Sequence, residues 1–154
     1  MGKLSKEGKA FYDAMVDVTS GNGVANITLV NNDSNVNIGR YDNGFVDMGD
    51  ISQFNAWGSY PTGAMQQGKL IHETVEQYTK AKLGYSNDGK TVGYDFSHRR
   101  GVDAENSVNG NISSTEQYRP GVYIVNYKER NGSVTTVSYT TSRRRMTVNQ
   151  VNKK

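Results

Sequence analysis

A chain of 154 residues, 34% of them hydrophobic and including ten Tyr, four Phe and one Trp, has material for one hydrophobic core, so we predict a single domain over residues 1–154. Cysteine is absent, which excludes disulfides, thiolate metal sites and a Cys nucleophile and leaves only Asp, Glu and two His as metal ligands. The net charge is +3, and neither an apolar run of the roughly 20 residues that cross a bilayer nor a signal-peptide pattern is present, so we expect no membrane span.

The first third of the chain is predicted to form one helix followed by short strands. Leu4, Phe11, Met15 and Val18 recur at helical spacing, which predicts a helix over residues 5–18. The breaker cluster TSGNG ends this helix. Three β-prone runs separated by Asn, Asp and Gly follow, and they predict a small antiparallel or mixed sheet with strands at residues 24–30, 35–41 and 44–51.

Two helices are predicted in the middle of the chain. After a loop that contains Trp57, a helix is expected over residues 65–83, closed by Gly84 as a C-terminal cap. The segment YSNDGKTVGYD is a loop or a short hairpin, because NDG is a strong turn signal. The second helix is predicted near residues 96–110, with Asp95 or Ser97 as its N-cap and Gly110 after its end.

The pattern changes to β from Tyr118 onward. Alternating runs predict strands at residues 121–129 and 134–141, with a last strand near 144–151, and the Asn-Gly at 131–132 is a strong hairpin signal. We therefore predict a C-terminal β-hairpin region over residues 118–151. The fold class is α+β: a small antiparallel or mixed sheet, a central helix, a second helix and a C-terminal β-meander.

The central helix carries the stretch LIHETVEQY at residues 70–78, which contains a candidate metal site. His72 and Glu76 are four residues apart, so they lie one above the other on the same strip of the helix and can offer two ligands to one metal ion. Glu73 is rotated by about 100° from His72 and would sit beside the metal. These positions predict His72 and Glu76 as ligands and Glu73 as the general base.

The remaining ligand must come from another element. The only other His, His98, belongs to the second predicted helix, and a His/Glu/His set with one open position is typical of catalytic zinc. Glu105 follows His98 by two helical turns on the same face. It would replace one ligand or hold the second ring nitrogen of a His ligand. We therefore predict a Zn²⁺ site from His72, Glu76 and His98, with Glu105 as the further candidate.

Two other functions remain open from the residues alone. A basic nuclease or nucleic-acid-binding module would use the basic residues that follow residue 142, among them Arg143, Arg144 and Arg145, together with Tyr-rich strands. A non-catalytic interaction domain would carry the His-Glu pair on an ordinary amphipathic helix, where Glu76 and Lys80 form a common i,i+4 pair.

The strand-bearing segment GFVDMGDISQF, a loop and then GKLIHETVEQY resemble the core of zincin metallopeptidases. They are most similar to the short metallopeptidase domains found as C-terminal toxin modules of bacterial RHS-type and other polymorphic toxins. The resemblance covers about residues 24–110. It implies that His72 is the first zinc ligand, that Glu73 is the general base and that an edge strand lines the substrate cleft. Glu76 departs from the family pattern, which has a second His there, and His98 matches a downstream third ligand.

This resemblance also implies an activity and a setting. The expected function is a zinc-dependent hydrolase, a peptidase that acts as a toxin or effector domain on a protein or peptide substrate. Such a domain is secreted or delivered into a target cell as part of a larger protein, and an immunity protein is an expected partner. A nucleic-acid partner belongs to the alternative of a nuclease.

Overall fold

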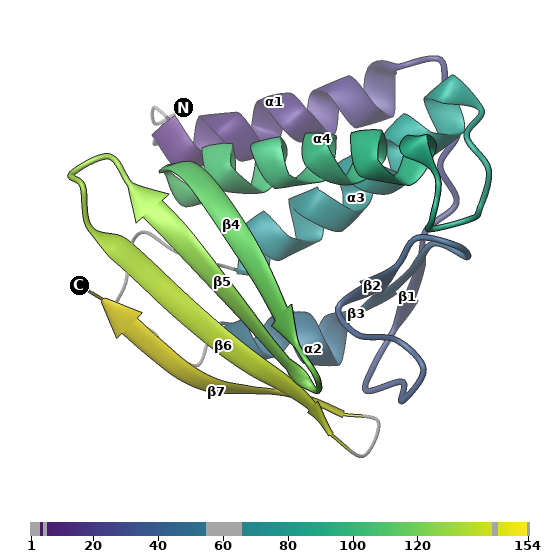
Figure 1. The fold of residues 1–154 in the computed structure, drawn as a ribbon. Helices are drawn as coiled ribbons and strands as arrows, with labels where there is room; N and C mark the ends of the chain where they lie inside the picture. The colour runs from purple at the N-terminus through teal and green to yellow at the C-terminus, as the bar shows by residue number, and fades with distance from the viewer. Residues whose placement is uncertain (1–3, 5, 55–65, 143–144, 154) are drawn as a thin grey trace.

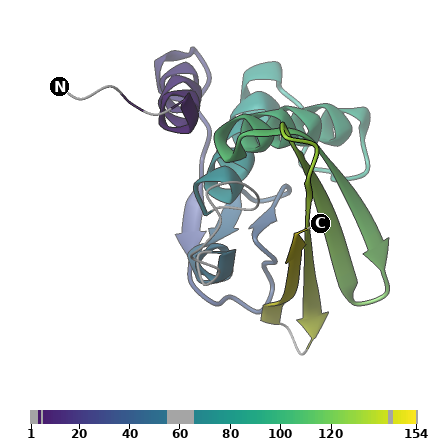
Figure 2. The same ribbon diagram turned by 90° about the vertical axis from the view of Figure 1, so that its left-hand side faces the viewer.

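The structure is a computed structural model that describes residues 4, 6–54, 66–142 and 145–153. Four helices and two small sheets lie within these residues, which confirms the predicted α+β class. Three helices gather on one side of the molecule and the sheets lie on the other (Figure 1). They are α1 (Lys6–Ser20), α3 (Gln66–Leu83) and α4 (Val92–Asn109). Helix α1 packs on the outside of the α3–α4 pair, on the side away from the larger sheet (Figure 2).

Helices α3 and α4 form the most extensive contact between helices in the fold. The predicted helix at 65–83 is confirmed, and Gly84 and Gly110 end the two helices in the left-handed conformation, with φ of 65° and 74°. The helices approach closely at two glycines. A Cβ at Gly68 would lie 2.2 Å from Asn109 Oδ1, and one at Gly101 would lie 2.7 Å from His72 Cδ2. The absence of side chains at these two positions therefore sets the spacing of the pair.

The start of α4 differs from the sequence prediction. Its N-cap is Thr91, whose hydroxyl accepts a hydrogen bond from the amide of Tyr94 at 3.4 Å, and neither Asp95 nor Ser97 caps the helix. Both predicted caps lie inside the helix, and the residues before Thr91 form a loop without a hairpin. The earlier start places His98 in the second turn of α4, where it can face α3.

The smaller sheet has the order β1-β3-β2 and is mixed, as predicted. Strand β1 (Thr28–Val30) runs parallel to β3 (Phe45–Asp47), and β2 (Gly39–Arg40) runs antiparallel to β3. The strands are shorter than the predicted runs. In the run 35–41 the backbone turns at Ile38, which adopts φ of 60°, and only Gly39 and Arg40 form a strand. Strands β1 and β2 are the two edges of this sheet, and β3 is its centre.

The prediction of one strand over residues 44–51 is wrong beyond Asp47. The chain there forms helix α2 (Met48–Ser52), because the buried Asp47 carboxylate accepts hydrogen bonds from the amides of Gly49 and Asp50 as an N-cap. The same carboxylate also accepts from the amides of Asn32 and Asp33. One buried side chain thus ends the strand, starts the helix and anchors the preceding loop.

The larger sheet is an antiparallel meander with the order β4-β5-β6-β7, which confirms the predicted C-terminal architecture. Its strands are β4 (Asn111–Arg119), β5 (Val122–Glu129), β6 (Val134–Ser142) and β7 (Arg145–Lys153). Strand β4 was not expected, because the predicted β region began at Tyr118. Most of the β4 side chains are exposed and polar, so the strand lacks the apolar alternation that marks a half-buried strand.

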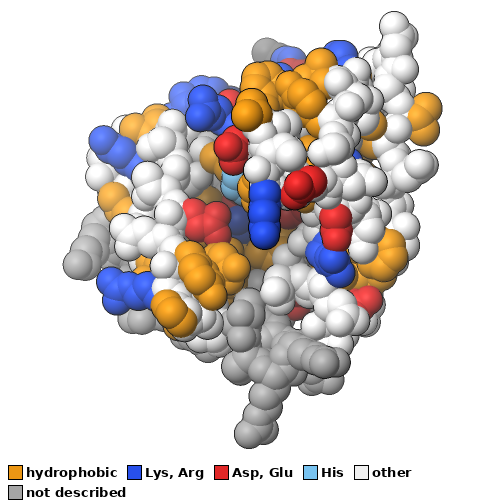
Figure 3. Space-filling view, turned by 45° about the vertical axis from the view of Figure 1, so that its right-hand side comes forward, with side chains coloured by type: hydrophobic (Ala, Val, Ile, Leu, Met, Phe, Trp, Pro, Cys, Tyr) orange, Lys and Arg blue, Asp and Glu red, His pale blue; other side chains and the backbone are white. Residues whose placement is uncertain are grey.

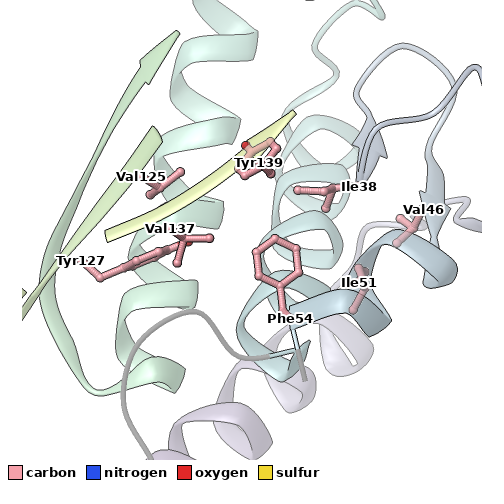
Figure 4. Close-up of a cluster of buried hydrophobic side chains, with 8 residues drawn as sticks. All are labelled: Ile38, Val46, Ile51, Phe54, Val125, Tyr127, Val137 and Tyr139. Carbon is pink, nitrogen blue, oxygen red and sulfur yellow. The ribbon is translucent and has the colours of Figure 1, made fainter. Parts of the chain in front are cut away.

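The hydrophobic core lies between the larger sheet, α2 and the smaller sheet (Figure 4). Its members come from both sheets and from the α2 region: Ile38, Val46, Ile51, Phe54, Val125, Tyr127, Val137 and Tyr139. The strand register places Val125 opposite Val137, which puts their side chains on one face of the sheet. None of the described helices has the length and apolar composition that a membrane-spanning helix needs.

Candidate metal centre

Three predicted ligands converge between α3 and α4. His72 and Glu76 lie one turn apart on α3, and His98 faces them from α4. The Nδ1 atom of His98 is 2.9 Å from Glu76 Oε2 and 3.2 Å from His72 Nε2, and the last two atoms are 3.8 Å apart. The three donor atoms therefore form a group that could hold a metal ion. The sequence predicts this set of three.

The spacing of the donors suits a small cation. Two ligand atoms that each lie about 2.1 Å from a tetrahedral zinc ion are about 3.4 Å apart. The three observed separations, 2.9, 3.2 and 3.8 Å, fall on both sides of that value. The side chains of His72 and Glu76 are buried, whereas the side chain of His98 is 31% exposed. The group is thus enclosed on the α3 side and open to a further ligand on the other.

Glu105 lies behind this group and not within it. Its Oε2 atom is 2.8 Å from His72 Nδ1, the ring nitrogen that faces away from His98. Its Oε1 atom accepts a hydrogen bond from the Tyr127 hydroxyl and is 2.8 Å from Lys69 Nζ. A carboxylate on Nδ1 fixes that nitrogen as the donor and leaves the Nε2 lone pair for a metal. The sequence left two roles open for Glu105: to replace one ligand or to hold the second ring nitrogen of a His ligand. This geometry corresponds to the second role.

The charges around His72 favour a cation at this place. Burial alone would lower the pKa of His72, but the contacts with Glu105 and Glu76 outweigh burial and raise this pKa to about 10. Burial opposes the ionised form of Glu76, and the two histidines reverse this effect, so its pKa is lowered. The carboxylates of Glu73, Glu76 and Glu105 outnumber the Lys69 ammonium by two.

Glu73 lies beside the donor group, against the edge strand of the smaller sheet. Burial is the main reason that its pKa is raised to about 7, and His72 partly offsets this effect. A Cβ at Gly39 would lie 1.9 Å from Glu73 Oε2, so the carboxylate occupies space that only a glycine in β2 leaves free. A carboxylate with a pKa near neutrality is suited to accept a proton at pH 7. Glu73 therefore has the position and the pKa of a general base.

The group opens into a cavity of about 440 Å³. A histidine side chain is visible at the bottom of a hollow bordered by acidic, basic and hydrophobic side chains (Figure 3). The wall next to the metal group is aromatic, because the Tyr94 ring stacks on His98 at 5.3 Å between centroids and forms a T-shaped contact with Tyr41. Burial, followed by the charge of Glu76 and that of Glu116, raises the pKa of Tyr94 to about 12, so its hydroxyl stays protonated at neutral pH.

Several residues of this site were not found from the sequence. Lys69 and Tyr127 hold Glu105, and Tyr94 covers His98. The sequence does contain a signal for Lys69. This residue lies three positions before His72 on the same side of the helix, and a lysine buried there needs a carboxylate partner. Tyr94 was assigned to the loop before α4, and it lies four residues before His98 on one helical face.

The alternative of a nucleic-acid surface rested on Arg143, Arg144 and Arg145. Arg143 and Arg144 lie outside the described residues, and of Arg145 only the backbone is described, in β7. The carboxylate of Asp103 on α4 is exposed and does not belong to the metal group. Within the residues that the structure describes, His72, Glu76 and His98 form the group that could hold a metal ion.

Comparison with other proteins adds no relative to this description. No protein-family model matches the chain, and no curated protein or solved structure is significantly similar to it.

Proposed function

We propose that the protein is a zinc-dependent hydrolase of zincin-like type that cleaves peptide bonds. The observation that carries the proposal is the convergence of His72 Nε2, Glu76 Oε2 and His98 Nδ1 with Glu73 beside them. Two imidazoles, one carboxylate and an open position form a ligand set that zinc accepts in hydrolases. The aromatic-lined cavity in front of this set has room for a segment of a peptide.

Each residue of the site has a distinct role in the proposed reaction. A zinc ion, when bound, supplies a Lewis acid that polarises the scissile carbonyl and makes water a stronger nucleophile. Glu73 accepts the proton of the attacking water and passes it to the leaving amine. Glu105 keeps His72 in one tautomer and orientation. Tyr94 stacks on His98 and shields that side of the site from bulk water.

Metal content and hydrolysis test this proposal together. We expect elemental mass spectrometry to find one zinc ion per chain in the purified protein. The variants His72→Ala and His98→Ala should contain no zinc. Glu73→Gln should keep the zinc, but its rate of casein hydrolysis should be at least a hundredfold lower, because a proton acceptor contributes about that factor or more. Asp103→Asn, which removes an exposed carboxylate on α4, is the matched control and should leave both unchanged.

Two results would contradict the proposal. One is protein without stoichiometric metal after purification and zinc dialysis. The other is hydrolysis that persists in Glu73→Gln, which would point to a different reaction at this site.

The proposed setting is that of a toxin or effector domain delivered as part of a larger protein and neutralised by an immunity protein. The resemblance of GKLIHETVEQY and its preceding segment to polymorphic-toxin modules supports this setting. Expression in the bacterial cytoplasm and, with an added leader, in the periplasm tests it. The wild-type chain should arrest growth in one compartment and Glu73→Gln should not. Normal growth with the wild-type chain in both compartments would refute the toxin role.

A further inference from the structure

The inner face of the larger sheet continues past the hydrophobic core toward the metal group. Cross-strand partners lie on the same face of a sheet, and the register aligns Glu116 with Val125 and Val125 with Val137. Because Val125 and Val137 are core residues, the side chain of Glu116 extends their row on the same face. Strand β4 thus presents a carboxylate to the cavity, and Glu116 is one of the residues that line it.

A neighbouring row on this face consists of tyrosines. The register aligns Tyr118 with Tyr123 and Tyr123 with Tyr139. The rings of Tyr123 and Tyr139 stack with centroids 5.0 Å apart and an interplanar angle of 7°, and Tyr118 meets Tyr123 at 4.9 Å. Tyr123 and Tyr139 also line the cavity. One wall of the cavity therefore combines two stacked aromatic rings with the carboxylate of Glu116.

Glu116 lies in the cavity with Lys69, which acts on it electrostatically, but neither of the two basic side chains of the cavity forms an ion pair with it. Arg40 pairs with Asp42, and Lys69 pairs with Glu105. Glu116 accepts one hydrogen bond, from the Tyr139 hydroxyl at 3.3 Å, and within the described residues no lysine or arginine forms an ion pair with it. The side chain is exposed, so a ligand can reach it from the cavity.

We infer that Glu116, Tyr123 and Tyr139 form a subsite for a basic side chain, Lys or Arg, of a peptide bound in the cavity. This inference rests on the proposed peptidase function and names the class of substrate. A cation is attracted by the face of a tyrosine ring and by a carboxylate, and the flexible stem of Lys or Arg packs on aromatic rings. An acidic substrate side chain would instead meet Glu116, Glu73 and Glu76 on the walls of the same cavity.

Peptide binding tests the inference without requiring cleavage. The probes are two fluorescein-labelled octapeptides of Ala and Gly that differ only in a central Lys or norleucine. Fluorescence anisotropy measures their affinity for full-length Glu73→Gln protein, with and without zinc. We expect the Lys peptide to bind about fivefold more tightly, the upper end for an ion pair at an exposed carboxylate. Equal affinities, or no binding of either peptide, would overturn the inference.

Exchanging the residues at positions 116 and 117 tests whether the preference for the Lys peptide depends on the position of the carboxylate. Gln117 follows Glu116 and points to the opposite face of β4, because side chains alternate along a strand. The double variant Glu116→Gln/Gln117→Glu keeps the composition and the net charge but moves the carboxylate to the outer face. The Lys-to-norleucine affinity ratio should fall to about one in this variant and in Glu116→Gln, and stay near fivefold in Gln117→Glu. A ratio that survives the exchange would also overturn the inference.

The same measurements separate this inference from the proposed function. If the protein binds no zinc and cleaves nothing, but the Lys preference is present and depends on Glu116, the peptidase proposal fails and the subsite stands. If zinc binds and peptides are cleaved with equal rates for Lys and norleucine substrates, the peptidase proposal stands and the subsite fails.

Discussion

Two regions of the protein interior differ in the polarity of the side chains that they bury. Between the larger sheet and α2 the buried hydrophobic side chains form one cluster, in which Ile51 and Val137 are each 1% exposed. Helices α3 and α4 also bury apolar side chains such as Ile71, but around the metal group they bury charged ones: Lys69 at 6%, Glu76 at 3% and Glu105 at 2% exposed. The apolar cluster is closed to water, whereas the charged group opens into the cavity beside the partly exposed His98, so the two regions differ in access as well as in chemistry.

This contrast separates a region that stabilises the fold from the region that carries the candidate site. Apolar burial contributes about 25 cal/mol for each Å² removed from water, and it needs no specific partner. A buried charge costs free energy unless a partner compensates it. The α3–α4 interior must therefore be satisfied group by group, and a divalent cation would complete it. We expect substitutions in the two regions to differ in size and in their dependence on metal.

The largest effect is expected from Lys69→Met, which removes the only ammonium that contacts Glu105 in the described structure. Leaving one member of a buried ion pair without its partner costs about 3–5 kcal/mol of the free energy of unfolding. Urea denaturation measures this loss. Lys69→Met/Glu105→Gln, which also removes the charge of the partner, should recover part of it. A loss below about 1 kcal/mol in Lys69→Met would show that the ion pair is not needed in this interior.

A comparable but metal-independent effect is expected from Ile51→Ala in the apolar region. Truncating a fully buried isoleucine costs about 3 kcal/mol through lost transfer free energy and a residual cavity. The loss in urea denaturation should be the same with zinc and with a chelator. A difference between the two conditions would mean that the core and the metal group are coupled.

Metal binding should stabilise the polar region by a somewhat smaller amount. An ion that binds only the folded chain, present at a hundred times its dissociation constant, adds about 2.7 kcal/mol to the free energy of unfolding. Denaturation in zinc and in EDTA measures this term. His98→Ala should abolish it, and Ile51→Ala should retain it. Equal stability of the wild-type protein in zinc and EDTA would contradict the assigned site.

The smallest effect on stability, with a large effect on activity, is expected from Gly39→Ala. The new methyl group would meet the end of the Glu73 side chain, which is flexible and can move aside. The free energy of unfolding should change by less than about 1 kcal/mol. Displacing the base by about 1 Å should lower kcat roughly a hundredfold while zinc content stays unchanged. A variant with normal kcat would show that Glu73 does not act from this position.

The sequence predicts the frame of the molecule and the first ligands of the site. Helical periodicity and glycine caps locate α1 and α3 closely, and the Asn-Gly turn locates the β5–β6 hairpin. The i,i+4 spacing of His72 and Glu76 places two candidate ligands on one strip of α3, and the scarcity of histidine then selects His98 as the third. These features could be predicted because each depends on residues close together in the sequence or on a very small number of candidates.

The missed features depend on contacts between distant residues. Strand β4 exists because β5 offers it a partner, although its own polar sequence does not demand a strand. Helix α2 begins where Asp47 also binds the loop amides of Asn32 and Asp33. The role of Glu105 follows from Tyr127, 22 residues away, and from Lys69. Local propensity carries no information about such pairings.

The glycine at the crossing of the two ligand-bearing helices bears on which ion the centre would select. A Cβ at Gly101 would lie 2.7 Å from His72 Cδ2 and 2.8 Å from the His72 carbonyl oxygen. Ordinary contact between such atoms is about 3.5–4 Å, so one methyl group would push the helices apart by about 1 Å. The ligand distances of zinc and calcium differ by only a few tenths of an ångström. With glycine at position 101, the two helices can lie close enough for the donor atoms to fit a small ion. A methyl group there would widen the gap between the helices by more than the difference between the ligand distances of a small and a large ion.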